Sequence, residues 1–162
     1  GSYEDMANII KRHIPAWPVA LERFFRLVVF NYIFANGDAH LKNFSVLYLE
    51  DGELQLAPAY DLINTHIHLD DSDFAMRDGL SPNLEKSDSY EQTGHPCQDD
   101  FRRFGLQIGL SSKRVEAVLK PFMIFPNEVK QLIERSYFSD DKLKRTYWRI
   151  IEERRQRFVR EA

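Results

Sequence analysis

The sequence predicts a mainly α-helical domain with one β-hairpin, an α+β fold in which residues 1–162 form a single domain. Apolar residues recur at helical spacing near the N-terminus and through the C-terminal half of the chain. Between these regions, two short apolar-rich runs flank Asp51-Gly52, which is typical of a hairpin. The 162 residues are 43% hydrophobic and include 12 Phe, which is enough to pack one core.

The first helix is expected to run to about His13. Ser2 and Asp5 match a loose capping box at its start. Pro15 and Pro18 are expected to end it, because proline interrupts a helical pattern.

A second helix is expected over about 19–35. Its second half is apolar nearly all round apart from Asn31, and a helix of this kind is normally buried. Gly37 is its expected C-terminal stop.

A hairpin is expected to follow the second helix. Residues 45–50 and 53–57 are its strands, and Asp51-Gly52 favours a two-residue type I′ turn. Pro58 ends the second strand.

Helical periodicity fades over residues 64–100, where turn-forming residues accumulate. Phe74, Met76 and Leu80 are expected to anchor this region to the core. Helical spacing then resumes, and helices are expected at about 98–108, 113–122, 127–136 and, with Ser139 as cap, to about Arg160.

The composition argues against several classes of protein. The net charge of -3 gives no global basic footprint for nucleic acid. The single cysteine, Cys97, excludes an internal disulfide and a cysteine-based zinc cluster, and it fits a reducing compartment. The N-terminus lacks a signal-peptide pattern, and no apolar run reaches the roughly 18 residues that span a bilayer. We therefore expect a soluble, cytoplasmic protein with no membrane partner.

A cluster of polar side chains follows the apolar helix, formed by Asp38, His40, Lys42 and Asn43. Because the hairpin returns the chain, we expect Asp61 to arrive close to Asn43. Such a pair offers the hard oxygen ligands that Mg²⁺ prefers. A second Asp can orient or deprotonate a hydroxyl, and a Lys can neutralise phosphate charge. This combination suits phosphoryl transfer, which depends on positioning, metal ions and charge compensation.

Structural interpretations of the same residues stay open. Asn36-Gly37-Asp38 can be plain turn chemistry. A lone histidine such as His40 is more often structural than catalytic. Asp61 can cap a helix that starts at Leu62. The clustering of these side chains puts the functional interpretation on equal terms with the structural one.

These residues resemble a known family. The chain reads Asp38-Ala-His40-Leu-Lys42-Asn43-Phe44-Ser45 and then Pro58-Ala-Tyr60-Asp61-Leu62, which is similar to the signature of HipA-like serine/threonine kinases. The Asp-x-His-x-x-Asn core is also similar to the catalytic loop of lipid kinases related to phosphoinositide 3-kinase. The resemblance is strong from about Tyr3 to Leu80. From about Asp99 onward it is weaker, though compatible with a helical kinase C-lobe.

The resemblance implies the helical C-terminal, catalytic lobe of a HipA-like, lipid-kinase-related protein kinase that uses ATP and Mg²⁺. It implies that Asp38 is the catalytic residue that faces the substrate hydroxyl. It assigns Asn43 and Asp61 to the metal and the ATP phosphates. Lys42 matches a motif lysine that compensates phosphate charge, and His40 matches the motif histidine, with a structural or supporting role.

Part of a kinase is missing from this sequence. A kinase needs a phosphate-covering loop and an ATP-positioning lysine on an N-terminal lobe, and neither is found before Asp38. We therefore expect the N-terminal ATP-loop lobe to be absent from this chain and supplied in cis or in trans. The isolated chain is expected to have negligible kinase activity. The resemblance also implies a bacterial toxin of a toxin–antitoxin pair, a DNA-binding antitoxin, and a protein substrate such as an aminoacyl-tRNA synthetase.

A rival interpretation concerns residues 101–119, which read like a DNA-binding helix-turn-helix. The side chains that would contact phosphates are Arg102, Arg103, Lys113 and Arg114. A helix pair capped by Ser111 or Ser112 is the plainer explanation, and the negative net charge argues against direct nucleic-acid binding. A non-catalytic interaction module is a further alternative, against which the intact motif residues argue.

Overall fold

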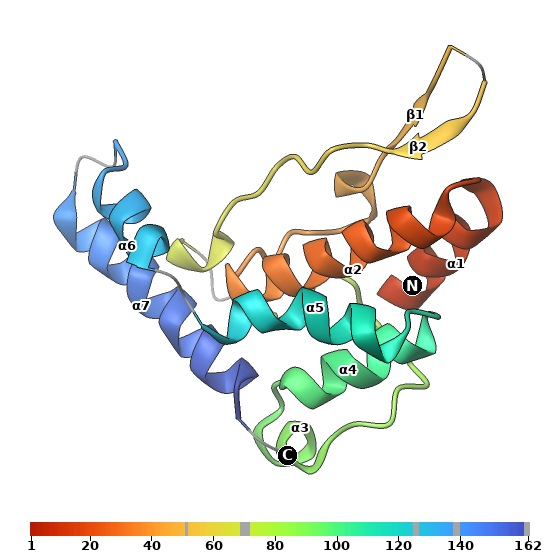
Figure 1. Cartoon of the computed structure of the whole chain (residues 1–162). Coiled ribbons are helices and arrows are strands. Elements are labelled where there is room, and N and C mark those ends of the chain that lie inside the picture. Colours follow the sequence, from red (N-terminus) through yellow and green to blue (C-terminus); the bar gives the residue numbers. More distant parts are fainter. Residues whose placement is uncertain (51, 69–71, 125–126, 138–139, 161–162) are drawn as a thin grey trace.

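The computed structural model of the chain describes residues 1–50, 52–68, 72–124, 127–137 and 140–160 (Figure 1). Its elements are α1 (Tyr3–His13), α2 (Trp17–Ile33), η1 (Leu41–Asn43), β1 (Val46–Tyr48), β2 (Leu54–Leu56), η2 (Thr65–Ile67), α3 (Asp88–Thr93), α4 (Gln98–Gln107), α5 (Ser112–Met123), α6 (Asn127–Glu134) and α7 (Asp141–Phe158). The prediction of a mainly α-helical fold with one hairpin is confirmed. None of the described helices is both long and apolar enough to cross a membrane.

Helix α2 lies at the centre of the helical body. It packs against α1, α5 and α7, and Figure 1 shows α5 and α4 running beneath it. Phe24, Phe25 and Tyr32 on this helix are at most 1% exposed, which confirms that its apolar face is buried. The hairpin β1–β2 projects away from the helices (Figure 1).

Aromatic contacts join regions that are distant in the sequence. The ring of Tyr3 lies 5.8 Å from that of Phe74, and Phe74 lies 6.2 Å from Phe101 of α4. Phe101 lies 5.5 Å from Phe158 of α7. Buried aromatic pairs at such distances stabilise a core beyond the area that they bury. Phe74 and Leu80 are buried and Met76 packs on the core, so the expected anchoring of the loop region is confirmed.

The ends of α2 differ from the prediction. The helix begins at Trp17, so Pro18 lies in its first turn, where the missing N–H costs nothing. It ends at Ile33, and Ala35 rather than Gly37 takes the left-handed conformation, with φ of 55°. The Asn36 amide donates to the Asn31 carbonyl at 2.8 Å, which closes the helix at this point.

Two predicted turn details involve residues outside the described part of the chain. The strands pair antiparallel with Val46 opposite Leu56, while the predicted type I′ turn involves Asp51, which is not described. Ser139, the predicted cap of the last helix, is not described either. The N-cap of α7 is Asp140, whose side chain accepts from the Lys142 amide at 2.7 Å.

Candidate active site

A buried asparagine fixes the segment that carries the polar cluster. Asn36 is 4% exposed, and its Nδ2 donates to Asn31 Oδ1 at 3.1 Å and to the Asp61 carbonyl at 3.2 Å. Its Oδ1 accepts from the Asp38 backbone amide at 3.3 Å. This side chain therefore connects three parts of the chain: the end of α2, the segment that carries Asp38 (the Asp38 segment) and the residues after the hairpin. Asn36 was not among the predicted site residues, and its one sequence signal is Asn31, the polar exception in an apolar helix.

Asn43 and Asp61 are in direct contact. Asn43 Nδ2 donates to Asp61 Oδ2 at 2.7 Å across 18 residues of sequence, so the hairpin return brings the two side chains together as expected. Asn43 is 8% exposed, and its Oδ1 is buried with no hydrogen-bond partner in the described part of the chain. A carboxylate only accepts hydrogen bonds, so the amide nitrogen must face Asp61 and the amide oxygen is left for another group.

Asp61 has an unusual backbone conformation. Its φ is 55°, in the left-handed region that Asp tolerates better than most residues. The chain forms no helix at Leu62, and the next helical turn, η2, is capped by Asn64. The interpretation of Asp61 as a helix cap is therefore wrong. Residues held in sparsely populated conformations cluster at functional sites.

Asp38 is the exposed member of the cluster. Its side chain is 60% exposed, and one carboxylate oxygen lies 3.9 Å from His40 Nε2. His40 Nδ1 is buried and has no hydrogen-bond partner among the described residues. The His40 ring therefore has Nε2 near Asp38 and Nδ1 buried, while the Asp38 carboxylate is accessible to a group from solution.

Two tyrosine hydroxyls donate to backbone carbonyls on either side of His40 and hold the loop. The Tyr3 hydroxyl donates to the Ala39 carbonyl at 2.9 Å. The Tyr60 hydroxyl donates to the Lys42 carbonyl at 2.5 Å. The Lys42 side chain is left exposed to solvent at the edge of the cluster.

A second support reaches the loop from α7. Thr65 Oγ1 accepts from the Gly37 amide at 2.9 Å, and the Thr65 amide donates to the Ala35 carbonyl at 3.1 Å. The next residue, His66, has Nε2 2.7 Å from an Arg154 guanidinium nitrogen. Arg154 is 4% exposed and forms an ion pair with Asp73. The sequence assigns no role to Asp73. It places Arg154 among the basic residues of the last helix, which are expected to form a solvated face, and the burial of Arg154 shows that this expectation is wrong for this residue.

The Asn43–Asp61 pair offers oxygen ligands for a hard cation. Mg²⁺ is usually held by one or two carboxylates together with water and substrate phosphates. In the ranges that the structure describes, no group of three or more His, Cys, Asp or Glu side chains could hold a metal. The buried, unpaired Asn43 Oδ1 next to a carboxylate fits a cation that binds together with a phosphate ligand.

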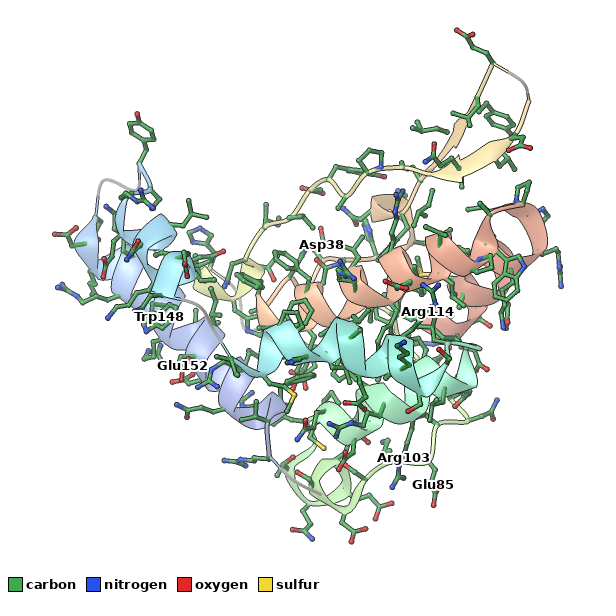
Figure 2. All side chains as sticks on the ribbon, in the orientation of Figure 1. Asp38, Glu85, Arg103, Arg114, Trp148 and Glu152 are labelled. Atoms are coloured by element: carbon green, nitrogen blue, oxygen red, sulfur yellow. The ribbon has the colours of Figure 1, made fainter. Side chains whose placement is uncertain are left out.

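The segment 101–119 forms the helix pair α4–α5, with Ser111 as N-cap of α5. Three of its four basic side chains contact oxygens of the chain itself. Arg102 lies 2.7 Å from Glu116, Arg103 donates to the Glu85 carbonyl at 3.0 Å, and Arg114 pairs with Glu22 (Figure 2). Most of the side chains that the DNA-binding interpretation needs are thus already engaged. The pair fits a structural role in the helical body.

The comparison with protein families gives a direct match. A family model described as HipA-like C-terminal domain matches residues 1–128. A protein of Haemophilus influenzae named "Putative kinase" is 29% identical over 144 residues, which are 84% of this chain and 42% of that protein. A Sinorhizobium fredii protein, also named as a putative kinase, is 35% identical over 75 residues, which are 46% of this chain and 18% of that protein. The chain thus spans less than half the length of these relatives.

A solved structure shares the fold. A chain in the Shewanella oneidensis toxin–antitoxin complex of HipA, HipB and operator DNA matches with a TM-score of 0.72. The two are 18% identical, and the match covers 98% of this chain and 36% of that chain. At this identity the likeness concerns the fold alone.

Proposed function

Since the chain belongs to the family of HipA-like C-terminal domains, we propose that it is the catalytic lobe of a protein serine/threonine kinase. The proposed reaction transfers the γ-phosphoryl group of ATP to a Ser or Thr hydroxyl of a protein, with Mg²⁺. Residues 1–162 form one lobe in this proposal. The phosphate-covering loop and the ATP-positioning lysine belong to a second lobe, supplied in cis or in trans.

The observation that carries the proposal is the Asn43–Asp61 contact of 2.7 Å, with Asn43 Oδ1 buried and unpaired among the described residues. A buried acceptor without a partner costs about 1–3 kcal/mol. A site that tolerates this loss of stability is expected to give the acceptor a hydrogen-bond or metal partner when a ligand binds. The exposed Asp38 carboxylate, in the same loop as Asn43, supports a role toward a second substrate.

Each residue of the cluster has a separate role in the proposed reaction. Asp38 accepts a hydrogen bond from the substrate hydroxyl and orients its oxygen toward the γ-phosphorus. It takes the proton as the oxygen–phosphorus bond forms and the bond between the γ-phosphorus and the bridging oxygen breaks, which releases ADP. His40 supports Asp38 from a distance of 3.9 Å. Lys42 offsets charge on the phosphoryl oxygens. Asn43 and Asp61 hold Mg²⁺, which when bound neutralises negative charge on the ATP phosphates.

The partners that we propose for the whole protein are inferred from its similarity to related proteins. The solved neighbour is part of a complex of HipA, HipB and operator DNA. We extend this to a bacterial toxin whose partner is a DNA-binding antitoxin. The proposed protein substrate acts in translation, with an aminoacyl-tRNA synthetase as the candidate.

The test uses the chain combined with an ATP-binding lobe of the same protein. Transfer of radiolabelled phosphate from ATP to bacterial proteins is measured for the wild type and for Asp38→Ala. We expect Asp38→Ala to reduce transfer roughly 10²–10⁴-fold, the usual contribution of a general base. Unchanged transfer would contradict the proposal. Asp88→Ala, at an exposed position in the first turn of α3, is the matched control and is expected to retain full transfer.

The lobe arrangement has its own measurement. In a coupled assay, the wild-type 162-residue chain alone is expected to hydrolyse ATP no faster than the same isolated chain with Asp38→Ala. Robust turnover by the isolated chain would show that the second lobe is not needed and would contradict this part of the proposal.

A further inference from the structure

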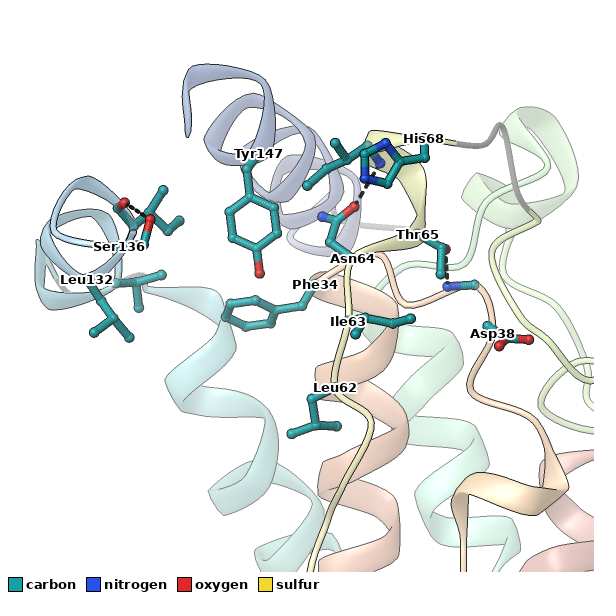
Figure 3. A pocket seen from close by; sticks show the side chains of 14 residues that line it. Phe34, Asp38, Leu62, Ile63, Asn64, Thr65, His68, Leu132, Ser136 and Tyr147 are labelled. Atoms are coloured by element: carbon teal, nitrogen blue, oxygen red, sulfur yellow. Dashed lines mark hydrogen bonds between the residues drawn. The ribbon is translucent and has the colours of Figure 1, made fainter. Parts of the chain in front are cut away.

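A large groove borders Asp38. It has a volume of about 900 Å³ and lies between residues 62–68 on one side and helices α6 and α7 on the other (Figure 3). Phe34 at the end of α2 lies between these walls, and Gly37 and Asp38 form one rim. We call this cavity the Asp38 groove. A molecule bound at this rim lies next to the proposed catalytic residue.

The walls of the Asp38 groove are apolar and accessible. Leu62 is 45% exposed and Ile63 is 49% exposed on one wall, and Leu132 of α6 is 68% exposed on the opposite wall. Exposed aliphatic side chains gathered around one cavity mark a site of molecular contact. Its described lining contains no Lys or Arg, so the Asp38 groove is not suited to a phosphate or a nucleic acid.

Two polar groups along the groove are complementary to a peptide. The Asp38 carboxylate can accept a hydrogen bond from a Ser or Thr hydroxyl. Asn64 Oδ1 accepts from the Ile67 amide at 3.2 Å, while Asn64 Nδ2 is buried and has no hydrogen-bond partner among the described residues. A backbone carbonyl, which every residue of a peptide carries, can accept a hydrogen bond from such an amide N–H.

We propose that the Asp38 groove binds a segment of the protein substrate. The segment places a bulky apolar side chain between Leu132 and Ile63, within a few residues of the Ser or Thr that it presents to Asp38. This inference rests on the proposed kinase function for the role of the hydroxyl. It adds a specificity that the motif residues do not carry, namely selection of the phosphorylation site by a neighbouring Leu or Phe.

Peptide binding to the 162-residue chain tests the groove without any need for catalysis. Fluorescein-labelled decapeptides carry one central Ser in an Ala/Gly background, with Leu, Phe or Asp placed in turn at each other position. We expect Leu or Phe at one or two positions to bind roughly tenfold tighter than Asp there, because burial of such a side chain is favourable. Equal anisotropy changes for all peptides would overturn the proposal.

Variants in the two walls identify the binding site. Leu132→Glu is expected to weaken the best peptide roughly tenfold or more, and Ile63→Ser on the opposite wall is expected to weaken it in the same direction. Leu106→Glu, at a leucine of α4 that is 51% exposed outside the groove, is the matched control and should leave binding unchanged. Circular dichroism verifies that each variant is folded. The proposal would be overturned if Leu106→Glu weakened peptide binding as much as the wall variants do, or if neither wall variant weakened it.

The alternative occupant is a second copy of the chain. Light scattering that finds a dimer in the wild type and a monomer in Leu132→Glu, with no peptide binding in either, would overturn the proposal in favour of self-association.

Transfer assays on the combined lobes separate this inference from the kinase proposal. A higher KM for the best peptide in Leu132→Glu at unchanged kcat supports the groove. If Asp38→Ala abolishes transfer while Leu132→Glu leaves KM unchanged, the groove proposal fails and the kinase proposal stands. If peptides bind through Leu132 but Asp38→Ala transfers phosphate normally, the kinase proposal fails and the groove still binds peptide.

Discussion

Asn36 donates a hydrogen bond of 3.2 Å from its side chain to the backbone carbonyl of Asp61. The contact couples the start of the Asp38 segment to a residue with left-handed backbone, on the far side of the hairpin. The same side chain accepts from the Asp38 amide at 3.3 Å. The positions of Asp38 and Asp61 therefore depend on one buried amide that carries out no chemistry itself.

Replacement of Asn36 is expected to loosen the site and the fold together. Asn36→Ala leaves Asn31 Oδ1 and the Asp38 amide without these partners, and the expected cost is about 2 kcal/mol of unfolding free energy. Urea denaturation followed by circular dichroism measures the change. Asn83→Ala, at an exposed asparagine, should stay within about 0.5 kcal/mol of the wild type. A cost for Asn36→Ala as small as that of Asn83→Ala would contradict its structural role.

Asp61 has a proposed metal-binding role and an unusual backbone conformation, and two substitutions separate the two effects. Asp61→Asn keeps a side chain that tolerates left-handed backbone, so its unfolding free energy should stay close to the wild-type value. Asp61→Ala should cost about 1–2 kcal/mol, the penalty for this conformation without a short polar side chain. Both variants should lose Mg²⁺-dependent transfer in the combined lobes. Transfer retained by Asp61→Asn would remove the metal-binding role.

The Arg154–Asp73 pair is expected to be essential for stability. The side chains are 5% and 12% exposed, so removal of one partner leaves a charge with little solvent. Arg154→Met is expected to cost about 3–5 kcal/mol, and the double variant with Asp73→Asn should cost less than the sum of the single variants. Arg149→Met is the control on the same helix, because that side chain is 64% exposed and its pair with Glu153 should contribute under about 1 kcal/mol. Additive losses in thermal or urea unfolding would mean that Arg154 and Asp73 are not coupled.

Two buried tyrosines predict a loss of stability at high pH. Burial raises the pKa of the Tyr3 and Tyr32 phenols well above the usual value near 10. Above that value the unfolded chain releases these protons while the folded chain keeps them, so the unfolding free energy falls as pH rises. The limiting slope is about 1.4 kcal/mol per pH unit for each phenol.

Substitution by phenylalanine isolates this effect. Urea unfolding between pH 8 and pH 11 should show a shallower alkaline loss for Tyr32→Phe than for the wild type. Tyr137→Phe, at a fully exposed tyrosine, should keep the wild-type slope. A wild-type slope in Tyr32→Phe would mean that ionisation of this phenol does not drive alkaline unfolding.

Local patterns were sufficient for most of the secondary structure. The capping box of Ser2 and Asp5 forms as predicted, with both reciprocal hydrogen bonds present. One error is the helix α3 (Asp88–Thr93), which forms inside the region 64–100 where only loops were predicted. The other errors lie at helix ends, where local rules compete. Pro18 reads as a breaker but is equally compatible with a first turn, and Gly37 reads as a stop although the left-handed residue is Ala35. At these positions the local sequence is compatible with either helix boundary, and tertiary packing determines which one forms.

The sequence by itself determined the helical periodicity, the hairpin and the motif spacing, and through the hairpin it determined that Asn43 meets Asp61. These features depend on neighbours within a few residues or on the geometry of a single turn. Only the tertiary structure decided that Asn36 holds the loop, that Arg154 is buried beside Asp73, and that an apolar groove lies beside Asp38. Such contacts join residues from different elements, and no local spacing specifies which of many compatible side chains will meet when the helices pack.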